Sequence, residues 1–418
     1  MGCTSSTQAA LALPVVAPKV VAQVAHEVGT CEPQQRALGI KSTPSFHDSY
    51  ILRHKLGSGA FASVYAAMPL AGDIEQAVKV TDLRMRRGTG VFSGASDTKR
   101  CQEVWREVEM LQRIQGSKNA LGFVDAFMES GLSYVVMDKC DTSLLLALER
   151  KPVLNEQSIK GMLRGMLSGI AAIHEVRVVH RDIKPDNFLC LGEQATVKLC
   201  DFGFASTVLS DSVEDGLKGV YGTPPFMAPE ILCGPSYRMP VDVWSFGVIA
   251  YTLLLGVFPY MPKEHSSTGM KFAIIRDHPA PTFRPAKYCK PAEVCTSNAA
   301  TSLLHMLLQR QPFERASAKA ALASAFFTAE PEGCECQKDN LRPMLRSAKR
   351  IGLFDLPGQS EETLCDVDIR LAALQEESRI RLADAAARSK AWNKASAGQA
   401  PSEAEESVGS TFASGDSP

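Results

Sequence analysis

The sequence predicts an α+β protein in which a small antiparallel sheet with one helix precedes a larger, mainly helical region. Short β-branched runs separated by glycine occupy residues 50–80, a pattern typical of antiparallel strands joined by turns. Val104, Val108 and Leu111 then recur at helical spacing, which predicts one amphipathic helix over residues 103–114. Beyond residue 143 the periodicity is mostly helical, with predicted helices at 156–176, 240–256, 298–309 and 316–327.

Composition limits the classes of function. The chain has 418 residues, of which 45% are hydrophobic, so it can bury a substantial core. Its 45 Lys and Arg balance 46 Asp and Glu, and a net charge of -1 gives no global field for nucleic acid. We therefore expect no nucleic-acid partner. The 12 cysteines are scattered without a CxxC pair, which favours reduced thiols and a cytoplasmic chain.

Changes of composition divide the chain into three parts. Residues 1–48 carry several prolines and little periodicity, which indicates a flexible N-terminal segment, with ordered structure starting near Ser49. Residues 49–328 form the predicted domain. Residues 329–418 are a tail with one charged helical stretch, 361–392, and an end rich in Gly, Ser and Glu. The longest apolar run, 248–258, is far short of the roughly 20 residues that span a bilayer.

A turn rich in small residues lies between the first two predicted strands. It consists of Gly57, Ser58, Gly59, Ala60 and Phe61. Small residues let backbone N–H groups approach phosphate oxygens, although a plain hairpin turn has the same composition.

The next predicted strand contains a lysine among apolar residues. Lys79 needs an anionic partner there, because desolvation of an unpaired charge is costly. Glu107, on the predicted helix 103–114, is the natural partner. A solvated strand-edge lysine and an exposed helix glutamate are the alternatives if each residue is taken alone.

Two downstream segments carry polar residues of types used in catalysis. Asp182, Lys184 and Asn187 place a proton acceptor, a phosphate-directed cation and a metal-binding amide on one loop. Asp201, followed by Phe202 and Gly203, comes directly after an apolar strand-like run, where its carboxylate can meet Mg²⁺. Each of these segments alone could be a turn, but the occurrence of all of these motifs in this order is very improbable by chance.

Residues 50–327 resemble a eukaryotic serine/threonine protein kinase catalytic domain of the calcium/calmodulin-dependent or calcium-dependent-kinase type, without EF-hands. The resemblance extends to the sequence that begins at Asp242 and to Arg315, which would pair with Glu230 of an Ala-Pro-Glu motif. It implies a bilobal fold with a small sheet lobe and a larger helical lobe. A calcium loop starting at Asp366 is excluded, because Leu371 replaces its obligatory glycine.

The resemblance implies ATP and Mg²⁺ as cofactors and gives each residue a role. The glycine turn would cover the phosphates, and Lys79, held by Glu107, would contact the α- and β-phosphates. Asp201 and Asn187 would hold Mg²⁺, Asp182 would orient the substrate hydroxyl, and Lys184 would offset charge on the transferred group. The implied adenine site comprises Leu56, Val64, Ala77 and Leu189 as apolar walls, Met137 as back wall, and Asp138 to Cys140 as hinge.

The implied function is an active protein kinase acting on Ser/Thr hydroxyls of protein substrates. A catalytically impaired pseudokinase scaffold is the alternative, and a small-molecule kinase is less favoured. Lys184, together with Thr223 before Pro224, resembles the serine/threonine branch of the family. Asp186 indicates either a preference for basic substrate sites or a simple turn, and both readings stay open.

The regulatory sequence departs from the family. Gly219 stands near the position that commonly carries the activating phosphothreonine, so Arg181 lacks its usual phosphate partner. The carboxylates of Glu214 or Asp215, or the hydroxyls of Ser210 or Ser212, are the open alternatives. The stretch from Arg84 to Lys99 is rich in Gly and Arg, and we interpret it as an exposed insertion, with a basic contact patch as the alternative.

Both ends of the chain carry separate signals. Gly2 and Ser6 match an N-myristoylation sequence, and Cys3 offers a palmitoyl site, so peripheral membrane attachment and a free N-terminus are both open. In the tail, Leu364, Val367 and Leu371 recur at heptad spacing too briefly for a coiled coil, which favours a helix packed on the kinase lobe. The basic run 342–350 is the expected contact of any autoinhibitory or docking segment. We expect a monomer.

Overall fold

The computed structural model describes residues 38–42, 44–59, 62–86, 92–210, 215–263, 266–285, 296–329 and 340–353, together with Ile380. The chain divides into two units, Met1–Asp368 and Ile369–Pro418. All the described residues except Ile380 belong to the first unit, and the account below concerns that unit.

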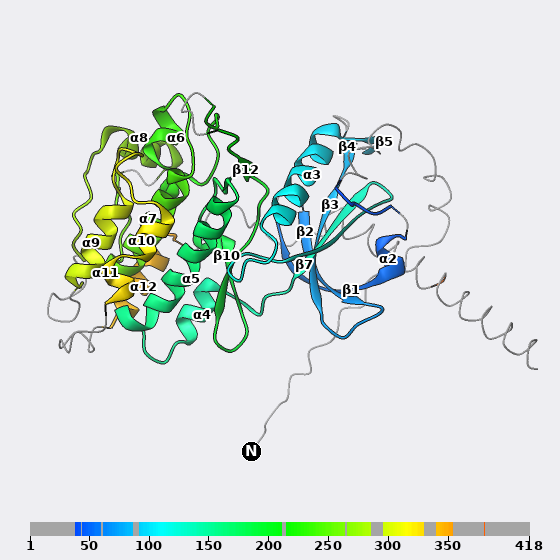
Figure 1. Cartoon of the computed structure of the whole chain (residues 1–418), viewed down its shortest axis with the longest axis horizontal. Helices are drawn as coiled ribbons and strands as arrows, with labels where there is room; N and C mark the ends of the chain where they lie inside the picture. The colour runs from blue at the N-terminus through cyan, green and yellow to red at the C-terminus, as the bar shows by residue number, and fades with distance from the viewer. Residues whose placement is uncertain are drawn as a thin grey trace, which may run out of the picture. The chain divides into compact units, whose positions relative to one another are not determined.

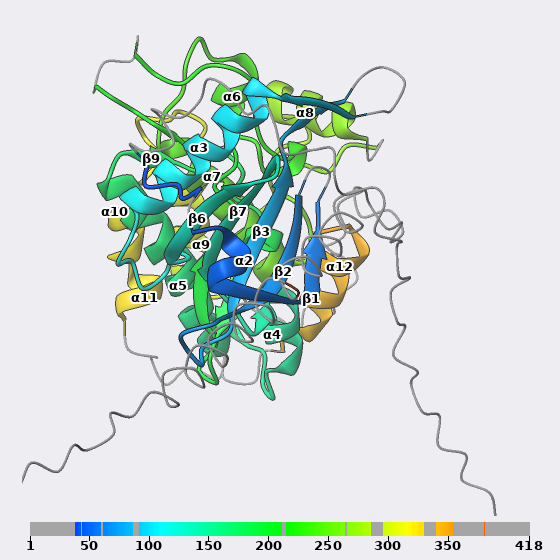
Figure 2. The ribbon, with the colours of Figure 1, turned by 90° about the vertical axis from the view of Figure 1, so that its right-hand side faces the viewer.

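An antiparallel sheet forms the N-terminal lobe, in the spatial order β1-β2-β3-β7-β6. Its strands are β1 (Tyr50–Ser58), β2 (Ala62–Pro69), β3 (Gln76–Asp82), β6 (Phe123–Glu129) and β7 (Leu132–Asp138). Helix α3 (Thr98–Arg113) lies beside this sheet (Figure 1, Figure 2). It begins before the predicted residue 103 because the Asp97 carboxylate accepts hydrogen bonds from the backbone N–H groups of Lys99 and Arg100 and caps the first turn.

Two segments of this lobe carry elements that the sequence did not predict. The stretch interpreted as an exposed insertion contains a hairpin, β4 (Arg84–Arg86) and β5 (Phe92–Ser96), that leads directly into α3. Packed structure also begins before Ser49, because α2 (Phe46–Ser49) buries Phe46 against Tyr134, with ring centroids 4.4 Å apart. Aromatic stacking over long sequence separation is invisible to periodicity, which explains the difference.

The C-terminal lobe is mainly helical and surrounds α7 (Pro240–Leu255), which is buried along its whole length (Figure 1). The surrounding helices are α4 (Leu144–Arg150), α5 (Glu156–Glu175), α6 (Pro229–Cys233), α8 (Ser267–Arg276), α9 (Asn298–Leu307), α10 (Ala318–Leu322) and α11 (Ala325–Thr328). Short strands border the junction of the lobes: β8 (Thr142–Ser143), β9 (Val178–Val179), β10 (Phe188–Leu191), β11 (Thr196–Leu199) and β12 (Ser206–Thr207). The predicted α+β fold with a small sheet lobe and a larger helical lobe is confirmed.

One predicted helix is divided. The periodicity over 316–327 corresponds to α10 and α11, because Ser324 has an extended backbone and starts a new helix. The Ser324 hydroxyl forms no hydrogen bond to the first turn of α11, so the extended backbone conformation alone separates the two helices. Within the described residues, no helix is long and apolar enough to cross a membrane.

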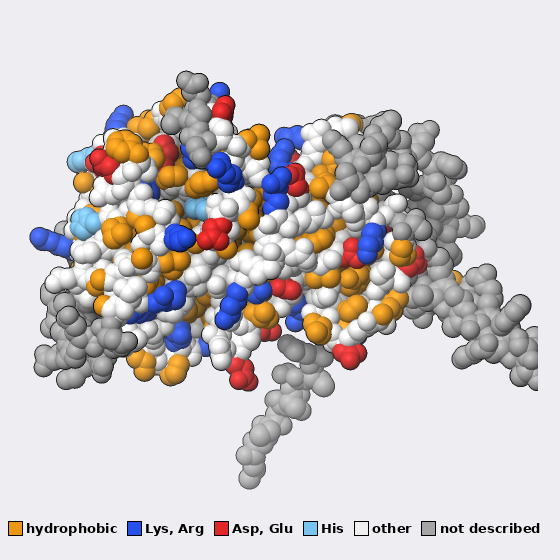
Figure 3. Space-filling view, viewed as in Figure 1, with side chains coloured by type: hydrophobic (Ala, Val, Ile, Leu, Met, Phe, Trp, Pro, Cys, Tyr) orange, Lys and Arg blue, Asp and Glu red, His pale blue; other side chains and the backbone are white. Residues whose placement is uncertain are grey.

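Part of the predicted tail packs on the C-terminal lobe. Helix α12 (Arg342–Arg350) lies against α7, and Met344 and Ser347 face Gly256 closely enough that a Cβ there would lie 2.8 Å from the Met344 sulfur. Lys349 forms an ion pair with Glu149 on α4 at 2.5 Å. The predicted helical stretch 361–392 and its heptad leucines lie outside the described residues, apart from Ile380. On the face shown in Figure 3, acidic and basic side chains are interspersed with apolar ones over both lobes.

Candidate active site

A buried carboxylate on α7 holds the loop that carries the predicted catalytic residues. We call residues 180–187, between β9 and β10, the catalytic loop. The backbone N–H groups of His180 and Arg181 donate to the Asp242 carboxylate at 2.8 and 2.9 Å. His174 on α5 contacts the same carboxylate at 2.9 Å. Sequence reasoning placed Asp242 in a central helix but missed this supporting role, for which the signal was a carboxylate within an otherwise apolar helix.

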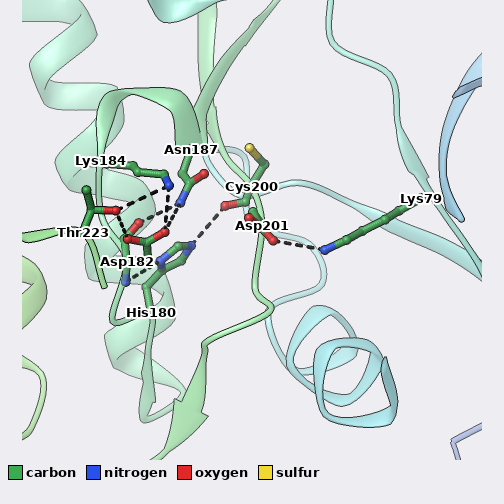
Figure 4. A network of polar contacts seen from close by, with 8 residues as sticks. All are labelled: Lys79, His180, Asp182, Lys184, Asn187, Cys200, Asp201 and Thr223. Carbon is green, nitrogen blue, oxygen red and sulfur yellow. Dashed lines mark hydrogen bonds and ion pairs between the residues drawn. The ribbon is translucent and has the colours of Figure 1, made fainter. Parts of the chain in front are cut away.

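Asp182 lies at the centre of a polar network on the catalytic loop (Figure 4). Asn187 donates from Nδ2 to the Asp182 carbonyl oxygen at 2.7 Å, and the Lys184 ammonium lies 3.1 Å from carboxylate oxygen Oδ2 of Asp182. The Thr223 hydroxyl donates to the other carboxylate oxygen, Oδ1, at 2.8 Å. The structure therefore brings together three predicted residues and adds Thr223, which the sequence indicated only as a marker of the branch.

Lys79 connects the two lobes. It lies on β3 between Val64 and Val135 of the neighbouring strands, and its ammonium contacts Glu107 on α3 at 2.7 Å and Asp201 at 3.1 Å. Figure 4 shows Lys79 reaching Asp201, which follows β11. The Lys79–Glu107 pair agrees with the prediction, and α3 is thereby tied to the catalytic centre.

Electrostatics keep this lysine charged. Burial alone would lower the pKa of Lys79, but the carboxylates of Glu107 and Asp201 outweigh it and raise that pKa. Lys79 in turn lowers the pKa of Asp201 to about 2. Burial raises the pKa of Glu107, an effect that Lys79 opposes. At neutral pH the site therefore presents a fixed cation beside an ionised Asp201.

The residues present fit a magnesium ion shared with phosphate oxygens. Asp201 offers a carboxylate, and Asn187 offers its amide oxygen because Nδ2 is engaged with Asp182. Within the described part of the chain, no cluster of three or more His, Cys, Asp or Glu residues could bind a metal without other ligands. Mg²⁺ is usually bound by one or two carboxylates together with substrate phosphates, so this donor set suits it.

The predicted nucleotide residues lie on four adjacent strands of the N-terminal sheet and on β10, which belongs to a separate sheet. Ala77 on β3 pairs with Met137 on β7, and both are buried. Val64 lies on β2, and Leu56 is exposed on β1. Leu189 lies on β10, which follows the catalytic loop in the sequence. Gly57 and Ser58 end β1, and the Gly59 N–H closes the turn on the Ala62 carbonyl at 2.8 Å, whereas Ala60 and Phe61 lie outside the described residues.

The segment after β7 offers its backbone. The Asp138 carboxylate is occupied by the Gly122 N–H and the Lys198 ammonium, each at 3.0 Å, so it is not a ligand group. The backbone N–H of Cys140 has no hydrogen-bond partner among the residues that the structure describes. Burial raises the pKa of the Cys140 thiol to about 12, which keeps it protonated. A purine edge would therefore meet main-chain groups here, as the resemblance implies.

A second ion pair, between α6 and the segment before α10, is buried. Arg315 contacts Glu230 through two bonds of 2.6 and 3.1 Å, and its side chain is 0% exposed. This pair agrees with the predicted one. It fixes the chain that follows Thr223, since Glu230 belongs to α6.

A family model, described as the protein kinase domain, matches residues 50–327. The chain belongs to the protein kinase family. This match covers the sheet lobe, the catalytic loop, Asp201 and the Arg315–Glu230 pair, which is the region that the resemblance indicated. Every predicted catalytic residue lies within the matched range, and the segment containing α12 lies beyond it.

Similar proteins include kinases from distant organisms. The chain is 32% identical over 282 residues to CDPK-related kinase 8 of Arabidopsis thaliana, covering 66% of this chain and 43% of that protein. It is 32% identical over 289 residues to a probable serine/threonine-protein kinase of Encephalitozoon cuniculi, covering 69% and 46%. The chain thus spans less than half of these two relatives. It is 30% identical over 311 residues to the phosphorylase b kinase gamma catalytic chain, liver/testis isoform, of Bos taurus, covering 72% and 71%.

The kinase domain also shows which regulatory candidates are engaged. The Ser210 hydroxyl donates to the Asp215 carboxylate at 2.5 Å, so these two candidates contact each other. Glu214 and Ser212 lie outside the described residues. Gly219 has a φ of 92°, a conformation that residues with a side chain rarely adopt. The structure therefore gives a backbone reason for the glycine at this position.

Proposed function

We propose that this chain is a Mg²⁺- and ATP-dependent protein kinase that phosphorylates Ser and Thr hydroxyls of protein substrates. The observation that carries the proposal is the position of the Asp182 carboxylate, which contacts Lys184 and Thr223. In the sequence, only strands β10 and β11 lie between the catalytic loop and Asp201, which contacts Lys79. A proton acceptor and two fixed cations thereby share one site. Phosphoryl transfer needs mainly this kind of alignment and charge neutralisation.

Each group has a defined part in the transfer. Asp182 accepts the hydrogen bond of the substrate hydroxyl, whose oxygen forms a bond to the γ-phosphorus of ATP while the bond to the β,γ-bridging oxygen breaks. The hydroxyl proton passes to Asp182, and ADP departs. Lys184, 3.1 Å from Asp182, offsets charge on the transferred group, and Lys79 binds the other phosphates. When bound, Mg²⁺ supplies additional neutralisation of phosphate charge.

Substrate preference follows from neighbouring groups. Thr223 lies within hydrogen-bond distance of Asp182 and agrees with the serine/threonine branch, and similar proteins are named serine/threonine kinases. Asp186 is exposed on the catalytic loop, one residue before Asn187. Its charge supports a preference for substrates with basic residues near the acceptor.

The experiment compares peptides and variants under identical conditions. Purified full chain is incubated with Mg²⁺ and γ-labelled ATP and three peptides that differ only in Ser, Thr or Tyr as the acceptor, each with basic or neutral flanks. We expect transfer to Ser and Thr but not Tyr, and loss of transfer by about 10³-fold or more in Asp182→Asn and Asp201→Ala. No transfer despite an ATP-dependent rise in melting temperature would favour the pseudokinase scaffold. Equal use of neutral flanks would contradict the basic preference.

Attachment to a membrane is a separate proposal. Gly2 and Cys3 lie outside the described residues, so acylation of a cytoplasmic chain rests on the sequence alone. Cells expressing the chain would incorporate an alkyne myristate analogue, and a Gly2→Ala variant would not. Equal labelling of both proteins would contradict N-myristoylation.

A further inference from the structure

Arg181, next to the proton acceptor, has an unusual environment. Its backbone is left-handed, with a φ of 69°, and its N–H donates to Asp242. Its side chain donates from Nε to the Phe204 carbonyl at 2.5 Å. Within the described residues, no carboxylate forms an ion pair with its guanidinium. A charged group at the catalytic loop is therefore stabilised by something other than an anion.

The face of an aromatic ring contributes to that role, beside the Phe204 carbonyl and the Tyr237 side chain. The guanidinium carbon of Arg181 lies 4.3 Å from the ring centroid of Tyr221. The Tyr221 ring also packs near Phe204, with centroids 6.0 Å apart. A planar guanidinium over an electron-rich ring is an attractive arrangement, and this one is in contact with solvent, since Tyr221 is 40% exposed.

Two glycines make this arrangement sterically feasible. Gly219 has a φ of 92°, and a Cβ there would lie 2.7 Å from Tyr221 Cε2. Gly222 has a φ of 105°, and a Cβ there would lie 2.5 Å from the Arg181 carbonyl oxygen. Side chains at either position would displace the ring or the catalytic loop. Gly219 has no hydroxyl that could be phosphorylated to bind Arg181, and its lack of a side chain leaves room for the Tyr221 ring that stacks on Arg181.

The contact is coupled to the reaction centre by a short chain of bonds. Tyr221 precedes by two residues Thr223, whose hydroxyl donates to Asp182 at 2.8 Å (Figure 4). Arg181 directly precedes Asp182 in the catalytic loop. The Arg181–Tyr221 stack and the Asp182–Thr223 hydrogen bond thus both connect the catalytic loop to residues 221–223.

We propose that Tyr221 is a positioning residue. By stacking on Arg181 it holds Thr223 within hydrogen-bond distance of Asp182, so that the kinase is active without a phosphate group bound to Arg181. This inference rests on the proposed function. Among the described residues, the aromatic face of Tyr221 takes the place of an anion as the partner of Arg181. Activity is then constitutive with respect to a phosphate at Arg181.

The test is a double-mutant cycle with a matched control. Tyr221→Leu, Arg181→Met and the double variant are compared with Tyr221→Phe, which keeps the ring. We expect Tyr221→Leu to lower kcat about 3-fold to 30-fold with the KM for ATP within about twofold, and Tyr221→Phe to stay within about twofold of the wild type. In the Arg181→Met background, Tyr221→Leu should have little further effect. Additive losses, or equal losses in Leu and Phe, would overturn the proposal.

Two further measurements keep the test decisive. Wild type treated with phosphatase, with absence of phosphate checked by mass spectrometry, should retain its kcat, and a fall of tenfold or more would refute constitutive activity. If Tyr221→Leu does not fold, replacing Tyr221 by pentafluorophenylalanine weakens the ring's attraction for a cation at similar shape, and an unchanged kcat would then refute the stack. If the wild type transfers no phosphate, the proposed function fails separately, and hydrogen exchange at Arg181–Ile183 decides the inference. Exchange should rise in Tyr221→Leu and not in Tyr221→Phe.

Discussion

The buried Arg315–Glu230 pair gives the sharpest test of how the C-terminal lobe is stabilised. We consider Arg315→Met, which keeps much of the side-chain length and removes the charge. Arg315 also donates to the carbonyl oxygens of Gln309 at 2.9 Å and Pro240 at 2.8 Å, and its guanidinium lies 5.0 Å from the Trp244 ring centroid. The substitution therefore leaves one carboxylate and at least two carbonyls without their partner.

The expected loss follows from burial. Removing one partner of a buried ion pair costs about 3–5 kcal/mol, since the remaining charge is desolvated and unpaired. Glu230 is only 10% exposed, so solvent compensates little. For a domain of this size, about 1 kcal/mol shifts the melting temperature by about 2–4 °C, which predicts a fall of roughly 10 °C.

The assay is urea unfolding followed by tryptophan fluorescence, with thermal scans in parallel. The double variant Arg315→Met/Glu230→Leu should recover part of the loss, because it removes the unpaired carboxylate but not the unmet carbonyls. Glu230→Gln serves as a mild control that keeps a hydrogen-bonding side chain. A loss below about 1 kcal/mol in Arg315→Met, or a double variant less stable than the single one, would refute the reasoning.

Three other predictions concern the site. Thr223→Val should lower kcat about tenfold, because the charged carboxylate of Asp182 loses the hydrogen bond that the Thr223 hydroxyl donates. Thr223→Ser, which keeps the hydroxyl, should keep most of the activity. Peptide phosphorylation measures kcat of both variants, and an equal loss in both would contradict the role of the hydroxyl. Lys79→Met should lower the melting temperature by leaving Glu107 buried without its cation, and adding Glu107→Gln should restore stability but not activity in scanning fluorimetry and transfer assays. The pKa of Asp201 falls from an ordinary 3.8 to about 2, so its charge stabilises the fold above about pH 4 and that contribution disappears as pH falls towards 2. The stability advantage of wild type over Asp201→Asn should shrink across that range by less than about 1 kcal/mol, since the carboxylate is half exposed; urea titrations at several pH values measure it, and a constant difference would contradict the assignment.

Much of the site was accessible from the sequence because its groups stand at fixed spacings on local elements. Lys79 lies in a strand and Glu107 in a helix that periodicity identifies, and Asp182 and Asn187 share one short loop. The periodicity of each segment predicts its type from its own residues. The pairing of Lys79 with Glu107 was predicted because a buried charge requires a counter-charge.

Other features depend on residues that are distant in the chain. The support of the catalytic loop by Asp242 and His174 and the stacking of Tyr221 on Arg181 have no local pattern. The same holds for α12, whose basic residues indicated a contact but not that Met344 would pack on α7. Only packing decides these contacts.

By itself, therefore, the sequence determined the identity of the elements, the family and the chemical groups of the site. The tertiary structure alone decided how the catalytic loop is held and which group faces Arg181. Hydrophobic periodicity and turn residues are local properties of the chain. The partner of a buried polar or charged group is set by which distant backbone and side-chain atoms the completed fold brings within a few ångströms.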